Sequence, residues 1–358
     1  PMLTGSSSLS NAAITSPGRS MTPDALAQGV LSGQRRALAR AITLVESQRR
    51  DHRFAAADLL ERLAPHSGGS LRVGISGVPG VGKSTFIEAL GNHLIDQGHR
   101  LAVLSVDPSS AISGGSILGD KTRMETLSRR NQAFIRPSPA GRSLGGVARR
   151  TQESLLLCEA AGYDVVFVET VGVGQSETKV ADMTDMFVLM LLPGGGDELQ
   201  GIKRGIVELA DLILINNADG DLAAAAGRAA ADYRNAIRLL HPRSLGWQVP
   251  VLTCSSLCHD GVTRVWDIMQ AYAESRRKDG EFDSRRSAQA TAWLWSETAD
   301  SLLTALRTDP DIRRRLPEFE AAVALGKLPP TLAAQRLLSQ FLEGRREAPA
   351  QHEQRTQP

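Results

Sequence analysis

One glycine-rich stretch has the residue types and the spacing of a phosphate-binding loop. The stretch is GVPGVGKS, residues 77–84, and it fits the pattern G-x-x-x-x-G-K-[ST]. In this pattern the glycines let backbone N–H groups turn around a phosphate, Lys83 reaches the β- and γ-phosphates, and Ser84 binds Mg²⁺. A glycine-rich turn without a ligand is the alternative, but an apolar run precedes the stretch and a helical pattern follows it. The residues expected to contact the nucleotide here are Gly77, Val78, Pro79, Gly80, Val81, Gly82, Lys83, Ser84 and Thr85.

Two carboxylates end apolar runs, where a magnesium ion beside the phosphates would lie. Asp107 ends LAVLSVD and Glu169 ends YDVVFVE. One of them, directly or through water, can complete the oxygen shell of Mg²⁺, whereas a helix cap or turn residue is the alternative for either alone. The stretch TVGVGQSE follows Glu169, and in it the backbone N–H of Gly172 could contact the γ-phosphate. Loss of that phosphate would then release the loop, as in nucleotide switches.

A third stretch, NNAD at residues 216–219, resembles the Asn-Lys-x-Asp motif that reads guanine. Asp219 can accept from the N1–H and the 2-amino group of guanine, and adenine offers neither donor. Asn216 can bond N7 and tie its loop to neighbouring loops. Asn217 stands where the motif has Lys, and it is too short to lay an alkyl stem along the purine.

A further loop, CSSLCHDG at residues 254–261, can complete the base site. The backbone of Ser255, Ser256 and Leu257 can bond the guanine oxygen. Taken with NNAD, this loop predicts a guanine site in which the side-chain contact with one face of the purine is weakened. Cys254, Cys258 and His259 could instead suggest zinc, but the chain offers no second ligand pair at the usual spacing.

Two long connectors rich in glycine are candidates for switch segments. PSSAISGGSILGDKTRM, residues 108–124, carries Asp120, Lys121 and Arg123, and LLPGGGDELQGIK, residues 191–203, carries Lys203. Ordinary mobile connectors are the alternative interpretation.

The elements that must position these residues follow an α/β pattern between residue 71 and about residue 275. Six apolar runs alternate with helical stretches: LRVGIS, LAVLSVD, YDVVFVE, MFVLMLL, LILIN and VPVLTC. Such runs predict a mostly parallel, doubly wound sheet, whose ligands lie at the carboxyl ends of the strands. Together with the phosphate-loop motif at residues 77–84, this pattern indicates a P-loop fold. The expected organisation is a disordered leader over 1–20, an N-terminal helical extension over 21–68, a nucleotide-binding domain over 69–278, a C-terminal helical extension over 279–345 and a disordered tail over 346–358.

The composition of the chain argues against several classes of function and location. The chain has 358 residues and a formal net charge of +2, which argues against nucleic acid as a partner. No segment approaches the roughly 20 apolar residues of a membrane span, and residues 1–20 lack the apolar core of a secretory signal. Three cysteines fit a reducing compartment, so the cytoplasm is the expected location.

The C-terminal pattern leaves two interpretations open. Trp295, Ala299, Leu302, Leu303 and Leu306 share one helical face, which either packs on the chain's own core or serves self-association.

These motifs together resemble the MeaB/ArgK family of P-loop GTPases, of the SIMIBI class, whose animal member is MMAA. RVGISGVPGVGKST, VDPSS, GGSILGDKTRM, FIRPSP, LGGVA, VETVGVGQSE, LPGGGDELQGIK and NNAD follow in the family's order between about residue 23 and about residue 345. The family has Lys where this chain has Asn217.

The resemblance implies a Mg²⁺-dependent GTPase that acts as a chaperone of an adenosylcobalamin-dependent acyl-CoA mutase, typically methylmalonyl-CoA mutase. Such proteins gate cofactor loading and protect or reactivate the mutase. A cobalamin adenosyltransferase is a further implied partner, and a homodimer through the C-terminal helices is the implied assembly.

The resemblance also assigns roles to residues of this chain. It implies Lys83, Glu169 and Lys203 as catalytic groups and Ser84, Asp107, Asp120 and Glu169 as metal and switch residues. The nucleotide set adds Gly172, Asn216, Asp219, Ser255, Ser256 and Leu257 to the phosphate loop.

Three other functions compete with this one. The first is an ATPase or kinase linked to lysine, arginine and ornithine transport, against which the guanine-reading Asp219 argues. The second is a nickel-type metallochaperone GTPase, for which seven His and three scattered Cys offer little. The third is a signalling GTPase with unrelated targets.

Overall fold

The structure is a computed structural model that describes residues 22–47, 49–106, 124–137, 144–170, 176–194, 204–238, 244 and 246–346. The chain divides into two compact units, residues 1–276 and 277–358. The leader expected over 1–20 and residues 347–358 of the expected tail lie outside the described residues, whereas Arg346, the first residue of that expected tail, ends the last helix. Among the described helices, none combines the length and the apolarity that crossing a membrane requires.

The first unit is built on a seven-stranded sheet in which every pair of neighbours is parallel. The strands are β1 Leu71–Gly77, β2 Leu101–Val106, β3 Ala133–Arg136, β4 Val165–Thr170, β5 Met186–Leu191, β6 Leu212–Ile215 and β7 Val251–Thr253, in the order β3-β2-β4-β1-β5-β6-β7. The predicted doubly wound sheet is confirmed. Strand β3 was not among the predicted strands.

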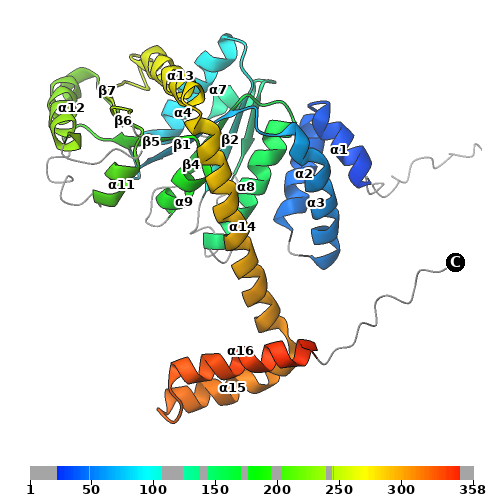
Figure 1. Ribbon diagram of the computed structural model, residues 1–358. Coiled ribbons are helices and arrows are strands. Elements are labelled where there is room, and N and C mark those ends of the chain that lie inside the picture. Colours follow the sequence, from blue (N-terminus) through cyan, green and yellow to red (C-terminus); the bar gives the residue numbers. More distant parts are fainter. Residues whose placement is uncertain are drawn as a thin grey trace, which may run out of the picture. The chain divides into compact units, whose positions relative to one another are not determined.

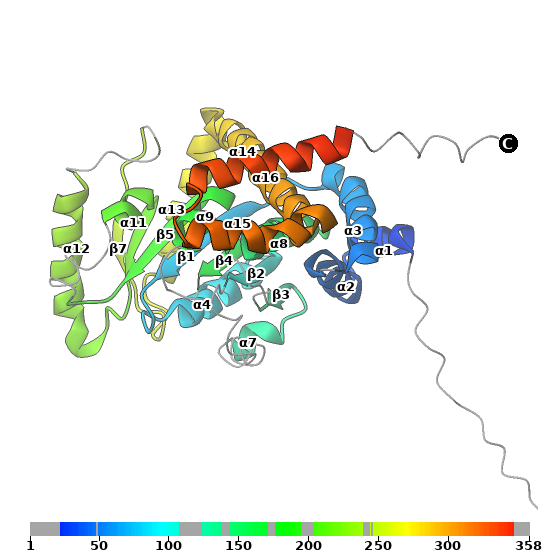
Figure 2. The same ribbon diagram turned by 90° about the horizontal axis from the view of Figure 1, so that it is seen from below.

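Helices cover both faces of this sheet and lie beside both of its edges. They are α1 Pro23–Leu31, α2 Arg35–Glu46, α3 Arg50–Leu63, α4 Lys83–Asp96, α7 Glu125–Ser128, α8 Leu144–Ala160, α9 Ser176–Met183, α11 Arg204–Leu209, α12 Ala223–Ile237 and α13 Val262–Lys278, with short 3-10 turns η1 Ala64–His66 and η2 Gly220–Leu222. Figures 1 and 2 show α1, α2 and α3 at the β3 end of the sheet and α12 beside β7 at the other end.

The alternation of side chains along the strands assigns the two faces. A Cβ added at Gly91 of α4 would lie 2.8 Å from Leu101 Cδ2, so the face that carries Leu101 packs on α4. A Cβ added at Gly74 of β1 would lie 2.8 Å from Val180 Cγ1 of α9. Leu104 and Val168 belong to this second face, whose core also includes residues of α1, α2, α3 and α8. Because neighbouring positions alternate, Ser105 and Glu169 belong to the α4 face.

The N-terminal helices begin where the sequence predicts. Thr22 is the N-cap of α1, its hydroxyl accepts a hydrogen bond from the N–H of Ala25, and Pro23 follows it. Leu38, Ile42 and Val45 of α2 are buried, as their helical spacing predicts.

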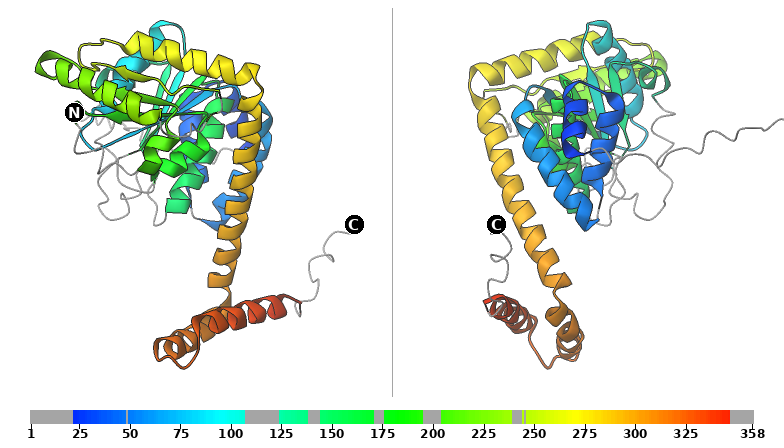
Figure 3. Two further views of the ribbon diagram at one scale, coloured as in Figure 1. Left: turned by 60° about the vertical axis from the view of Figure 1, so that its left-hand side comes forward. Right: turned by 90° about the vertical axis from the view of Figure 1, so that its right-hand side faces the viewer.

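The second unit is helical, with α14 Glu281–Thr308, α15 Pro310–Ala324 and α16 Pro330–Arg346 (Figure 3). Asp309 caps α15 by accepting from the N–H groups of Asp311 and Ile312. Ile312 and Phe341 are buried, but Trp295 and Leu302 of α14 are exposed. Both interpretations of this face of α14 therefore stay predictions.

Candidate functional site

The phosphate loop joins β1 to α4, as predicted. Gly82, with φ of 87°, is the N-cap of α4, so the N–H groups of the first turn face the end of the sheet. The Lys83 side chain is buried, and its ammonium donates to the carbonyls of Gly77 at 2.7 Å and Val78 at 3.2 Å. These bonds hold the ammonium inside the loop, where the β- and γ-phosphates of a nucleotide would lie.

Gly77 is required by the backbone of the neighbouring strand. A Cβ at this position would lie 2.3 Å from the carbonyl oxygen of Met190 in β5. Any side chain would push the phosphate loop away from the sheet, because a backbone carbonyl cannot rotate aside.

Two of the predicted magnesium residues meet beside the loop. Glu169 at the end of β4 is 6% exposed, and the Ser84 hydroxyl donates to its Oε1 at 3.1 Å. A hydroxyl and a carboxylate oxygen are the donors that Mg²⁺ prefers, and at phosphate sites one or two carboxylates suffice because the phosphates supply further ligands. The arrangement therefore fits a magnesium ion.

The base loops are tied to the phosphate loop through Asn216. This side chain is fully buried; its Nδ2 donates to the carbonyl of Val81 at 2.8 Å, and its Oδ1 accepts from the N–H of Ser256 at 3.2 Å and from its hydroxyl at 2.7 Å. Of the two roles predicted for Asn216, the structural tie is confirmed, whereas its bond to guanine N7 stays a prediction.

Asp219 is positioned by the loop after β7. The Ser255 hydroxyl donates to Asp219 Oδ2 and accepts from the N–H of Cys258 at 3.1 Å. A carboxylate oxygen can accept more than one hydrogen bond, so this contact orients Asp219 and leaves capacity for the two donors on the guanine edge.

The backbone conformation at residue 217 explains why asparagine stands there, which the comparison with the Asn-Lys-x-Asp motif does not reveal. Its φ is 55°, in the left-handed region where Asn is one of the few residues that sit with little strain. A Cβ added at Gly82 would lie 2.6 Å from Asn216 Nδ2 and 3.7 Å from Asn217 Oδ1. Both amide side chains therefore lie close to the last glycine of the phosphate loop.

Leu257 offers apolar surface at the base loop. Its side chain is 77% exposed, more than any other large apolar side chain in the described part of the chain. The hydrogen bonds of Ser256 and Cys258 fix the backbone on either side of it. Leu257 can therefore contribute a side-chain contact to a purine besides the predicted backbone contact.

We expect Asn217→Lys to tighten GDP binding by less than about fivefold. A lysine stem on the purine adds about 1 kcal/mol of apolar burial, and the gain falls to the extent that the loop leaves its left-handed conformation to relieve the strain of lysine in the free protein. Calorimetry with GDP and ATP measures the effect, and GTP-over-ATP selectivity should not change.

Asn217→Gly is the matched control for this substitution, because it keeps the backbone conformation and removes the side chain. Asp219→Asn changes the base edge instead and should favour xanthine nucleotides, whose C2 carbonyl accepts from the amide. Tight ATP binding by the parent protein would contradict the assignment of Asp219 as the base reader.

The residues that could suggest zinc, Cys254, Cys258 and His259, lie in the loop after β7. In the described part of the chain, which includes Cys254, Cys258 and His259, no group of three His, Cys, Asp or Glu side chains could hold a metal ion. Burial raises the pKa of the Cys254 thiol to about 12, so this sulfur is protonated at neutral pH.

Several predicted site residues lie outside the described residues, and their roles stay predictions. They are Asp107, Asp120, Lys121, Arg123, Gly172 and Lys203.

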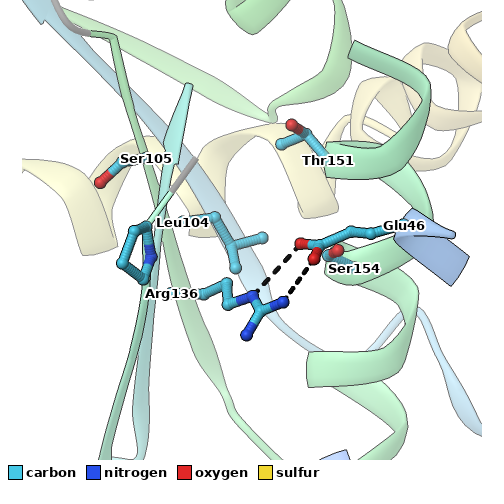
Figure 4. A pocket seen from close by; sticks show the side chains of 7 residues that line it. Glu46, Leu104, Ser105, Arg136, Thr151 and Ser154 are labelled. Carbon is cyan, nitrogen blue, oxygen red and sulfur yellow. Dashed lines mark hydrogen bonds and ion pairs between the residues drawn. The ribbon is translucent and has the colours of Figure 1, made fainter. Parts of the chain in front are cut away.

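A small hollow lies between residues of α2, β2, β3 and α8 (Figure 4). It is lined by Glu46, Leu104, Ser105, Arg136, Pro137, Thr151 and Ser154. Within it, the Arg136 guanidinium donates to both oxygens of Glu46 and so joins β3 to the end of α2. We assign this pair to the attachment of the N-terminal helices, since no predicted nucleotide residue lines the hollow.

Comparison with known proteins agrees with this geometry. The family model described as methylmalonyl Co-A mutase-associated GTPase MeaB matches residues 38–311. The chain is 55% identical to a putative GTPase of Caulobacter vibrioides over 89% of this chain and 97% of that protein. It is 50% identical to the mitochondrial methylmalonic aciduria type A homolog of Mus musculus over 89% of this chain and 79% of that protein.

Two further relatives carry other names. The chain is 46% identical to GTPase ArgK of Escherichia coli over 87% of this chain and 94% of that protein. It is also similar to a crystal structure of LAO/AO transport system kinase, with a TM-score of 0.72 and 38% identity over 92% of this chain and all of that one.

Proposed function

Because the chain belongs to the MeaB family of methylmalonyl Co-A mutase-associated GTPases, we propose that this GTPase is a chaperone of an adenosylcobalamin-dependent acyl-CoA mutase. Methylmalonyl-CoA mutase is the proposed partner. The GTPase would gate cofactor loading and protect or reactivate the mutase. The observation that carries the nucleotide part is the convergence of Lys83, the Ser84–Glu169 pair and the Asp219 base reader at one edge of the sheet. The family description supports the mutase part.

The chain's own residues account for nucleotide binding and for part of the hydrolysis. Asp219 orients the guanine edge, the loop N–H groups and Lys83 hold the phosphates, and Ser84 and Glu169 would hold Mg²⁺. When bound, Mg²⁺ supplies positive charge to the β- and γ-phosphate oxygens. Lys83 adds a second positive charge where the transition state gathers negative charge.

We assign the control of this reaction to the predicted switch segments. Lys121, Arg123 and Lys203 are the cations that these segments carry. A partner that brings one of them to the γ-phosphate would act as arginine fingers do, which contribute on the order of 10³–10⁵ in rate. By linkage, the nucleotide would then bias how the partner is bound.

We expect slow GTP hydrolysis by the protein alone and strong acceleration by its mutase. Phosphate release is measured while purified mutase is titrated in, and light scattering confirms the complex and its expected two copies of this chain. Lys203→Ala should abolish the acceleration, whereas Lys278→Ala, at the exposed end of α13, should not. An unchanged rate at saturating mutase, with the complex confirmed, would reject mutase-stimulated hydrolysis and favour another target.

We further propose a homodimer formed through the C-terminal helices. Exposed large apolar side chains support it, because single soluble chains rarely leave so many uncovered in a short helical unit. They are Leu294, Trp295, Leu302, Leu303, Leu325, Leu332, Leu338 and Leu342. We also propose a cobalamin adenosyltransferase as a further partner and the cytoplasm as the location of this protein.

A second candidate function is a kinase or ATPase of basic amino-acid transport. The name of the structure that matches with a TM-score of 0.72 favours it. It requires ATP binding, so nucleotide competition distinguishes the two: displacement of labelled GDP by ATP at similar concentrations would favour the kinase.

A further inference from the structure

One buried hydroxyl at the carboxyl edge of the sheet has no hydrogen-bond partner among the described residues. Ser105, in β2, is 2% exposed, and its Oγ makes no hydrogen bond within the described part of the chain. An unpaired buried hydroxyl is destabilising, and native proteins satisfy most of them. A serine at this position therefore calls for water, an ion or a functional role.

The strand register places Ser105 beside the magnesium residues. Ser105 of β2 is the register partner of Glu169 in β4, and adjacent strands are about 4.8 Å apart. Both side chains belong to the α4 face, and Ser84 of α4 donates to Glu169 from that side. Figure 4 shows Ser105 and Leu104 on opposite sides of β2, so the Ser105 hydroxyl does not point toward the Glu46–Arg136 pair.

We propose that Ser105 is a positioning residue for the magnesium site. Its hydroxyl donates, through one bound water, to the Glu169 carboxylate and holds that carboxylate toward Ser84 and the phosphates. Hydrogen bonds of this kind orient the carboxylates at metal sites, and their loss typically weakens metal binding by 10–100-fold. The inference rests on the proposed roles of Ser84 and Glu169 at Mg²⁺.

Ser105→Ala separates this role from a structural one. Alanine removes a buried polar atom that has no described partner, so the resistance of the metal-free protein to urea should not fall. A serine that only supports the fold would behave in the opposite way: its loss would lower the urea midpoint and leave magnesium binding unchanged.

The test titrates Mg²⁺ against the GDP complex and follows the release rate of a fluorescent GDP analogue. We expect Ser105→Ala to raise the Mg²⁺ midpoint about tenfold, within the range typical for such residues. GDP affinity in EDTA should not change, and Ser105→Thr should restore the parent midpoint because it keeps the hydroxyl.

Ser76→Ala is the matched control. Ser76 is also a buried strand serine, but its Oγ accepts from Thr170 at 2.8 Å on the other face of the sheet. This variant should lower the urea midpoint and leave the Mg²⁺ midpoint unchanged.

Two outcomes would count against the assignments, and they are distinguishable. A Mg²⁺ midpoint within twofold of the parent in Ser105→Ala, while Ser84→Ala shifts it, would overturn the role of Ser105 alone. If Ser84→Ala also leaves the midpoint unchanged, the magnesium site itself is wrongly assigned.

Discussion

Lys83→Ala is expected to lower the rate of GTP hydrolysis by at least about 10²–10³, the cost of removing one preorganised group that stabilises developing charge. Lys83 is 7% exposed, and its ammonium is held by the carbonyls of Gly77 and Val78. It therefore needs little reorganisation to meet the negative charge on the β–γ oxygens in the transition state. Alanine removes this group and leaves the charge to the loop N–H groups and, when bound, Mg²⁺.

Single-turnover phosphate release at saturating GTP isolates the chemical step from binding. The variant should be compared with the parent after GDP affinity and thermal unfolding have been measured, because two loop carbonyls lose a donor. Lys278→Ala controls for the loss of a lysine elsewhere. A rate within tenfold of the parent would show that Lys83 does not act on the phosphates in the transition state.

Glu159→Ala is expected to lower the free energy of unfolding by about 3–5 kcal/mol, the cost of breaking a buried ion pair from one side. The Glu159 side chain is fully buried, and it pairs with Arg72, of which only 15% is exposed. The Arg72 guanidinium donates to both carboxylate oxygens, at 2.9 and 2.7 Å. The N–H of Gly68 and the hydroxyl of Ser70 donate to them as well, at 2.9 and 2.6 Å.

This pair matters for the site because it anchors the start of β1, the strand that ends in the phosphate loop. Urea unfolding followed by circular dichroism gives the change in stability, and GDP affinity should fall in parallel. Asp96→Ala is the matched control: it breaks the exposed pair with Arg130 and should cost less than about 1 kcal/mol. A loss below about 1 kcal/mol in Glu159→Ala would mean that water replaces the carboxylate at Arg72.

The fold class and the phosphate site could be predicted from the sequence because their determinants are local. A strand buried on both faces is apolar throughout, so four of the seven strands contain continuous apolar runs of four or more residues. The glycines, Lys83 and Ser84 lie within eight consecutive residues, so no long-range information is needed to recognise the loop. The guanine motif is similarly short and directly follows such a run.

Sequence alone did not reveal which distant segments contact one another. Asn216 donates to Val81, 135 residues earlier in the chain, and no local pattern encodes that distance. The register of β2 on β4 places Ser105 beside Glu169, and only the assembled sheet sets a register.

Backbone conformation and buried charge were likewise decided by the tertiary structure. In the sequence, Asn217 appears only as the loss of the lysine of the Asn-Lys-x-Asp motif. Its left-handed φ shows that the backbone at this position suits asparagine. Glu159 and Arg72 look like ordinary surface residues in the sequence, and they become an anchor only when α8 buries the carboxylate against the start of β1. Local periodicity and short motifs therefore determined the elements and the chemistry of this protein, whereas contacts between distant segments decided which residues hold that chemistry in place.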